Sequence, residues 1–169
     1  MNEVLKHTIR FIIFILIQVL ILNNISFLGR FTPFLYLSIL LALPVNERKV
    51  LLLPIAFVTG IIIDMFSNTA GMHAAACVFM VFCQPLITRS LSERDTYDYK
   101  QTKAGAQGLR GMVFYTVIMV FLHHLVLFYL EAFSLDYFWS VLFRTIINTL
   151  ITSFLIIVVK LIFTNPVSR

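Results

Sequence analysis

Long apolar stretches separated by short polar segments run along the whole chain. A run of about 20 apolar residues is long enough for an α-helix to cross the hydrocarbon core of a bilayer. We therefore expect an all-α membrane protein, with residues 1–169 forming a single polytopic membrane domain. The pattern predicts about six transmembrane helices: Ile9–Ser26, Pro33–Val45, Val50–Phe66, Met72–Thr88, Met112–Leu130 and Trp139–Phe163.

The second of these helices is short for a bilayer crossing, so it is expected to begin nearer Phe31 or to lie shallow or tilted. The first apolar run lacks a small-residue cleavage site and is expected to stay as a helix. Composition agrees with a membrane protein, because 60% of the residues are hydrophobic and only 12% are charged. Cys77 and Cys83 are six apart on one expected helix and point to different faces, so no disulfide is expected between them.

The distribution of basic residues predicts the orientation, because cytoplasmic loops carry the excess of Lys and Arg. With both termini in the cytoplasm, only Arg30 and Arg144 of the 13 basic residues lie on or towards the outer side. The outer loop before Trp139 is acidic, with Glu131 and Asp136. The net charge of +5 does not indicate a nucleic-acid partner, since the basic residues form short clusters between apolar runs. The inner segments hold Lys6, Arg10, Arg48, Lys49, Arg89, Arg94, Lys100, Lys103, Arg110, Lys160 and Arg169.

A polar connection at about residues 90–110, rich in alternating charge, is the longest loop and is predicted to face the cytoplasm. It contains Gly105 and Gly108, which oppose a long helix. Two interpretations remain open. The loop is either a solvated tether or a docking surface for a cytoplasmic partner or for anionic lipid head groups.

Ionisable groups inside a bilayer are costly and are therefore functional candidates. At a rise of 1.5 Å per residue, Asp64 lies roughly 5 Å and Arg144 about 8 Å inside the outer boundary of their helices. The matching depths predict an ion pair that joins the third helix to the sixth. Contact of either group with a ligand or a partner protein is the alternative.

Further polar residues gather towards the outer side of the expected bundle. Arg144, Asn148 and Thr152 recur every four residues, so this stripe should face the interior of the bundle. His73, His123 and the neighbouring His124 also fall in the outer half, but their spacing matches no metal-binding motif. No metal and no other cofactor is expected.

Small residues four apart occur on two adjacent helices, as Ala56 with Gly60 and as Gly71 with Ala75. Such pairs let helix backbones approach closely, so the third and fourth helices are expected to form a tight hairpin. The chain has no phosphate loop, nucleophile elbow or carboxylate pair. It is therefore not expected to be an enzyme.

The segment from Gly60 to His73, with Asp64 and Gly71 between them, resembles the signature of MreD, the rod shape-determining membrane protein family of bacteria. The Ala74–Ala76 run and Gln84-Pro85 that follow are similar to the same family. The resemblance implies a multi-pass protein of the bacterial inner membrane, with a fold resembling the substrate-binding subunits of energy-coupling-factor transporters. It also implies a non-enzymatic scaffold of the cell-elongation complex, which supports peptidoglycan synthesis and cell shape.

The resemblance implies MreC as the direct partner and, indirectly, RodA, a class B penicillin-binding protein and MreB. Membrane lipids are also expected to contact the chain. The shared fold suggests an alternative, a small-molecule-binding subunit of a membrane transporter with its pocket on the outer side. Such subunits have a run of alanines on the first helix, whereas Phe11–Leu22 is bulky here with Gln18 as its polar interruption. A membrane-embedded enzyme is a third reading, with no acid, base and nucleophile set to support it.

Overall fold

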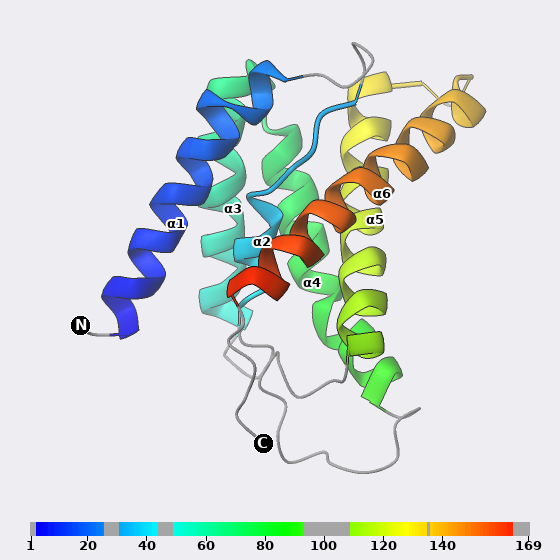
Figure 1. The fold of residues 1–169 in the computed structure, drawn as a ribbon. Coiled ribbons are helices and arrows are strands. Elements are labelled where there is room, and N and C mark those ends of the chain that lie inside the picture. Colours follow the sequence, from blue (N-terminus) through cyan, green and yellow to red (C-terminus); the bar gives the residue numbers. More distant parts are fainter. Residues whose placement is uncertain (1–2, 26–30, 44–48, 93–108, 135, 164–169) are drawn as a thin grey trace.

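The computed structural model describes residues 3–25, 31–43, 49–92, 109–134 and 136–163, and these ranges form a bundle of helices (Figure 1). The all-α prediction is confirmed for this part of the chain. The elements are α1 (Glu3–Leu20), the 3₁₀ turn η1 (Leu22–Asn24), α2 (Leu37–Leu40), α3 (Lys49–Ser67), α4 (Met72–Ser92), α5 (Leu109–Ala132) and α6 (Phe138–Phe163).

Helices α3, α4, α5 and α6 alternate in direction, and α1 runs in the same direction as α3 (Figure 1). Helices α3, α4, α5 and α6 pack as consecutive neighbours, and α1 lies against α3. In Figure 1, α1 and α3 end in the upper part of the view, where α4 and α6 begin. We call this the upper end of the bundle, and it corresponds to the side predicted to face outward.

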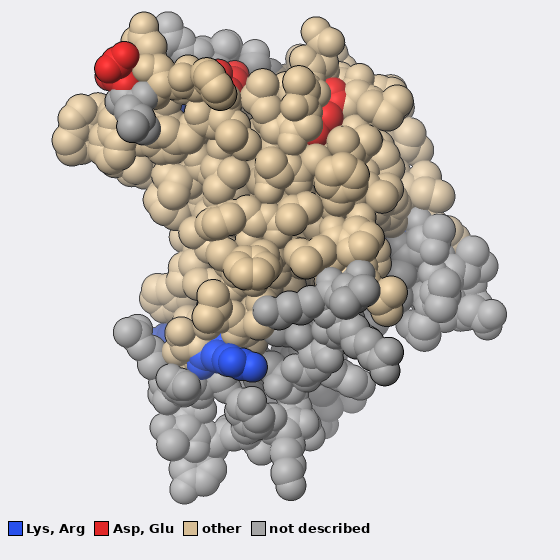
Figure 2. Space-filling model, turned by 180° about the vertical axis from the view of Figure 1, so that it is seen from behind, with Lys and Arg blue, Asp and Glu red and all other residues tan. Residues whose placement is uncertain are grey.

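The described residues contain three helices long and apolar enough to cross a membrane, Met72–Leu91, Leu109–Ala132 and Phe138–Ile162. Two shorter apolar helices accompany them, Ile9–Asn24 and Leu51–Ser67. Figure 2 shows a broad uncharged band with acidic side chains at one end and basic side chains at the other. This is the charge distribution expected of a chain that sits across a bilayer.

The prediction of a second long helix at Pro33–Val45 is wrong over the described residues 33–43. Residues 32–34 are irregular and α2 is a single turn of four residues, Leu37–Leu40. We call residues 31–43 the α2 segment. Its side chains are mostly buried, with Tyr36, Leu37 and Leu40 at 0% exposure. It is therefore enclosed by the other helices, and apolar character here reflects burial in protein instead of contact with lipid.

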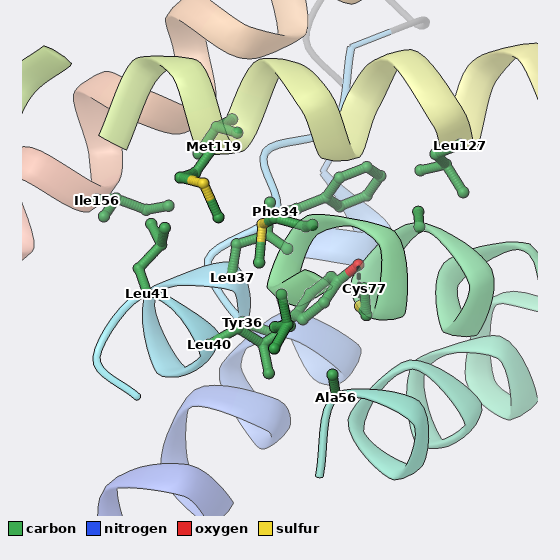
Figure 3. Close-up of a cluster of buried hydrophobic side chains, with 14 of the residues drawn as sticks. Phe34, Tyr36, Leu37, Leu40, Leu41, Ala56, Cys77, Met119, Leu127 and Ile156 are labelled. Atoms are coloured by element: carbon green, nitrogen blue, oxygen red, sulfur yellow. Dashed lines mark hydrogen bonds between the residues drawn. The ribbon is translucent and has the colours of Figure 1, made fainter. Parts of the chain in front are cut away.

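Figure 3 shows how the α2 segment fills the centre of the bundle. Its side chains meet apolar groups from α3, α4, α5 and α6 in one buried cluster. The residues labelled there are Phe34, Tyr36, Leu37, Leu40 and Leu41 of the segment, with Ala56, Cys77, Met119, Leu127 and Ile156 around them.

Irregular backbone away from water must bond its N–H and C=O groups to protein. In the α2 segment, side chains of the neighbouring helices provide these bonds. The N–H of Leu35 donates to Gln18 Oε1 at 2.7 Å, and Gln18 Nε2 donates to the carbonyl of Pro33 at 3.1 Å. Gln18, the polar interruption of α1, is 0% exposed. It replaces the hydrogen bonds that a regular helix would have made.

The polar stripe of α6 binds the same segment. The N–H of Thr32 donates to Asn148 Oδ1 at 3.1 Å, and that of Phe34 donates to Thr152 Oγ1 at 3.2 Å. Asn148 and Thr152 are buried, so these two residues face the bundle interior as expected. Their role is to satisfy backbone that no secondary structure satisfies.

Helix α4 continues past Pro85 to Ser92. Cys77 and Cys83 on this helix are free thiols. The long loop expected at about residues 90–110 falls mainly on 93–108, outside the described residues.

Candidate functional site

The turn between α3 and α4 is built around Asp64, which is 3% exposed. Its carboxylate accepts hydrogen bonds from the backbone N–H groups of His73 and Ala74, each at 3.0 Å, and from the hydroxyl of Thr69. The first N–H groups of a helix have no partner within the helix, and their partial positive charge favours an anion. Asp64 therefore caps α4 from the preceding helix.

The backbone of the same turn closes α3. Asn68 has a φ of 54°, and the N–H of Thr69 donates to the carbonyl of Asp64 at 3.1 Å. This is the arrangement of a Schellman motif, in which a left-handed residue, often Gly or Asn, ends the helix. Gly71 has a φ of 79°, which a residue without a Cβ adopts at little cost. Asp64 thus ends one helix with its backbone and starts the next with its side chain.

Gly60 is the point of closest approach between α3 and α4. A Cβ atom built at this position would lie 2.3 Å from the Cα of Ala74, which is a backbone atom and cannot move aside. The close contact expected for Gly60 is present, and Ala56 beside it is buried. The expected contribution of Ala75 is wrong, because Ala75 is exposed and the residue in contact is Ala74.

Arg144 forms its ion pair with Glu131 at the end of α5, with 2.9 Å between Nη1 and Oε2. Its guanidinium also lies over the ring of Phe128, 4.3 Å from the centroid. The expected Asp64–Arg144 pair is therefore wrong. Both groups lie at the upper end as their depths indicated, but Asp64 already has three donors from the turn that follows it.

Three histidines and Tyr36 form a buried polar cluster below this end. The Tyr36 hydroxyl lies 2.9 Å from both His73 Nδ1 and His123 Nε2. His124 Nδ1 lies 2.7 Å from the carbonyl oxygen of Val120. The ring of Phe34 stacks on His124 at 5.3 Å between centroids. The cluster joins the α2 segment to α4 and α5 by hydrogen bonds across the bundle core.

A cavity of about 390 Å³ opens at the upper end, between the ends of the helices. This volume is within the usual range of small-molecule sites. Several expected site residues lie on its wall, namely His73, Arg144 and Asn148. The rest of the wall is Val19, Asn23, Asn24, Thr32, Phe34, Phe66, Ser67, Thr69, Met72, Leu127, Phe128 and Glu131.

Sequence reasoning placed Glu131 on the outer side but missed its pairing with Arg144, and it singled out neither Tyr36 nor Asn23. Asn23 accepts a hydrogen bond from Gln18 and donates one to Ser67, so it joins the end of α1 to the end of α3. Glu131 was placed in the outer loop, whereas it lies in the last turn of α5. The sequence shows only that Glu131 is a charged residue near the end of a helix. Its pairing with Arg144 depends on how α5 is rotated about its axis, which the sequence pattern does not give.

Within the described ranges, no three His, Cys, Asp or Glu side chains converge as metal ligands do. The site is instead a polar cavity whose wall includes the Arg144–Glu131 ion pair and the buried His73. Comparison of the chain with protein-family models, with curated proteins and with solved structures gave no match.

Proposed function

We propose that this chain is a non-enzymatic scaffold of the bacterial inner membrane, of the MreD type, with both termini in the cytoplasm. In this role it binds MreC by lateral helix contact and supports the complex that elongates the lateral wall. RodA, a class B penicillin-binding protein and MreB join through MreC.

The observation that carries the proposal is the construction of the α3–α4 turn. The residues that resemble the MreD signature each have a mechanical role in it. Gly60 admits Ala74, Asp64 caps α4, and Gly71 takes a left-handed conformation. A carboxylate that accepts three hydrogen bonds is held as a structural group and is poorly placed to accept a proton from a substrate. This favours a rigid membrane scaffold.

The surface of the helices is suited to lateral contact. Large apolar side chains on α1 and α3 are exposed, among them Leu16, Leu20, Phe57 and Val58. In a bilayer these side chains meet lipid or another transmembrane helix. Helix association in lipid depends on packing and on interhelical hydrogen bonds. We therefore expect the exposed faces of α1 and α3 to bind a partner by close packing of helix surfaces.

The test is depletion of the chain in its own rod-shaped cell, combined with capture of tagged MreC. We expect rounding of the cell, co-purification of the chain with MreC, and no lost enzymatic product. Re-expression of an Asp136→Asn variant in the depleted cells is the control, because Asp136 is exposed in the α5–α6 connection. This variant should restore rod shape and capture by MreC. Normal rods after depletion, together with no capture by MreC, would contradict the proposal.

A second candidate function rests on the cavity at the upper end. A pocket of about 390 Å³ with polar and aromatic walls also suits the substrate-binding subunit of a transporter. Tight binding of a vitamin by the purified protein, without co-purification with MreC, would favour this function. The genes beside the coding sequence also discriminate, since those for MreC, RodA and a penicillin-binding transpeptidase accompany a scaffold of this type.

A further inference from the structure

The cavity at the upper end has two opposite charges side by side on its wall. The guanidinium of Arg144 and the carboxylate of Glu131 are 2.9 Å apart, and their side chains are 41% and 43% exposed. A guanidinium has five N–H donors, and this contact uses part of them. Both groups therefore have capacity left for a ligand in the cavity.

A third polar group on the cavity wall is His73, whose side chain is buried apart from this surface, with 4% exposure. Its Nδ1 is taken by the Tyr36 hydroxyl. Its Nε2 has no hydrogen-bond partner among the described residues and is not fully enclosed by protein atoms. The free nitrogen of this ring is therefore reached from the cavity.

The hydrogen-bond chain behind His73 determines which proton it carries. The Tyr36 hydroxyl has one hydrogen and lies between His73 Nδ1 and His123 Nε2. His123 Nδ1 is enclosed and unpaired. An unpaired acceptor is tolerated better in a protein interior than an unpaired N–H. With neutral rings, His123 therefore donates from Nε2 to Tyr36, and Tyr36 donates to His73 Nδ1. His73 then presents an N–H at Nε2 to the cavity.

The cavity thus offers a cation and an N–H donor beside a carboxylate. A ligand that carries only negative charge meets Arg144 and His73 favourably but is repelled by Glu131. A ligand with a phosphate and a primary ammonium matches both signs. A quaternary ammonium is a poorer match, because it has no N–H for the carboxylate and the Phe128 face is already covered by Arg144.

Apolar residues complete the wall, namely Val19, Phe66, Met72 and Leu127. Phe66, near the end of α3, is also 61% exposed. An exposed aromatic side chain on the cavity wall offers acyl chains an apolar path out of the cavity.

We propose that this cavity binds the head group of a phospholipid bearing a primary ammonium, with the phosphate at Arg144 and His73 and the ammonium at Glu131. Phosphatidylethanolamine has this chemistry. The inference is independent of the scaffold function, because it concerns the cavity alone and makes no use of MreC.

The experiment measures lipid bound to the purified full-length protein. The protein is exchanged into mixed micelles with equal amounts of phosphatidylethanolamine, phosphatidylglycerol and phosphatidylcholine, and bound lipid is counted by native mass spectrometry. We expect phosphatidylethanolamine to be enriched at least about 5-fold over each of the others. Equal occupancy by the three lipids would overturn the proposal.

Variants separate the two charges. Arg144→Gln should abolish the enrichment together with most head-group binding. Glu131→Gln should lose the preference over phosphatidylglycerol while it keeps phosphate binding. The matched controls are Arg110→Gln at the opposite end and Asp136→Asn outside the cavity, and both should behave as wild type. If Arg144→Gln and Arg110→Gln give the same lipid pattern, the site is not at this cavity.

Two further experiments test the cavity without the charge variants and test whether the ligand must be a lipid. Val19→Trp narrows the cavity from α1 and leaves the ion pair intact, so it should remove bound lipid even if the charge variants fold poorly. Soluble glycerophosphoethanolamine is the probe for a source other than lipid. It should compete only weakly, because it has no acyl chains, and competition at concentrations equal to the lipid would overturn a lipid as the occupant.

Discussion

Oδ2 of Asp64, in the last turns of α3, lies 3.0 Å from the backbone nitrogen of Ala74 in the first turn of α4. One side chain therefore holds two helices at a fixed angle and satisfies backbone donors that lipid cannot satisfy. The stability of this turn is the first quantity to measure.

Asp64→Ala should lower the free energy of unfolding by at least about 2 kcal/mol, because a buried cap with charge-assisted hydrogen bonds is lost. Asp64→Asn should cost less, since one carbonyl oxygen remains as acceptor. Thermal unfolding in detergent measures both, with Asp136→Asn as the exposed control. An Asp64→Ala protein that melts with the control would show that the cap contributes little.

The ion pair at the cavity predicts a weak coupling between Glu131 and Arg144. Both side chains are more than one-third exposed, so the coupling should be about 0.2–1 kcal/mol. Asp64 and Arg144 share no partner, and their effects should add within about 0.3–0.5 kcal/mol. Double-mutant cycles to Ala on both pairs measure this. A larger coupling for Asp64 with Arg144 than for Glu131 with Arg144 would contradict the observed pairing.

The contact of Gly60 with Ala74 predicts a difference between two adjacent alanines. Ala74→Leu should destabilise the protein strongly, whereas Ala75→Leu should be close to neutral, because Ala75 is exposed. Gly60→Ala should cost about 1–3 kcal/mol by overpacking. Abundance in the membrane and the midpoint of thermal unfolding are the readouts. Equal damage from the two Leu variants would place the contact elsewhere on α4.

Gln18 gives a prediction about the α2 segment. Gln18→Leu replaces the amide with an apolar side chain of similar size and leaves the N–H of Leu35 and the carbonyl of Pro33 without this partner. Each buried group left unpaired costs about 1–3 kcal/mol, so the variant should unfold at a clearly lower temperature. Asn24→Leu is the control, because Asn24 is exposed and bonds only to carbonyls of its own helix end. A variant as stable as this control would argue against Gln18 as the anchor of the segment.

The orientation is tested by reporter fusions. A reporter after Arg169 or within residues 97–101 should be cytoplasmic, and one between Glu131 and Asp136 should be periplasmic. A periplasmic signal from residues 97–101 would exclude the six-pass topology. A fusion in the α3–α4 turn after Ser67 serves as an independent outer position.

Hydropathy was sufficient to locate the five long helices, because each is a sustained apolar run. It failed at residues 33–45, since the same apolar composition fits a lipid-facing helix and a buried irregular segment equally well. The distinguishing signal was elsewhere in the chain, in Gln18 on α1 and in the polar stripe of α6. A polar residue in an apolar helix is unfavourable unless it has a hydrogen-bond partner. Here the partners are the backbone groups of the α2 segment.

The site was predicted less well than the fold. Depth along a helix brought Asp64 and Arg144 to the same level, but it contains no information on the direction in which either side chain points. Asp64 found its donors within ten residues, in the turn that follows it. For Tyr36, the bonds to His73 and His123 depend on three separate elements and have no sequence pattern.

The hydrogen bonds of the α2 segment also constrain how the chain is made. Thr32 and Phe34 bond to residues 116 and 118 positions later, on the last helix. A ribosome delivers this segment to the membrane long before α6 exists. Until α6 has been made, these backbone groups need other partners, such as water. A chain truncated after α5 leaves these two N–H groups without their α6 partners, and we expect it to be degraded faster than the full chain.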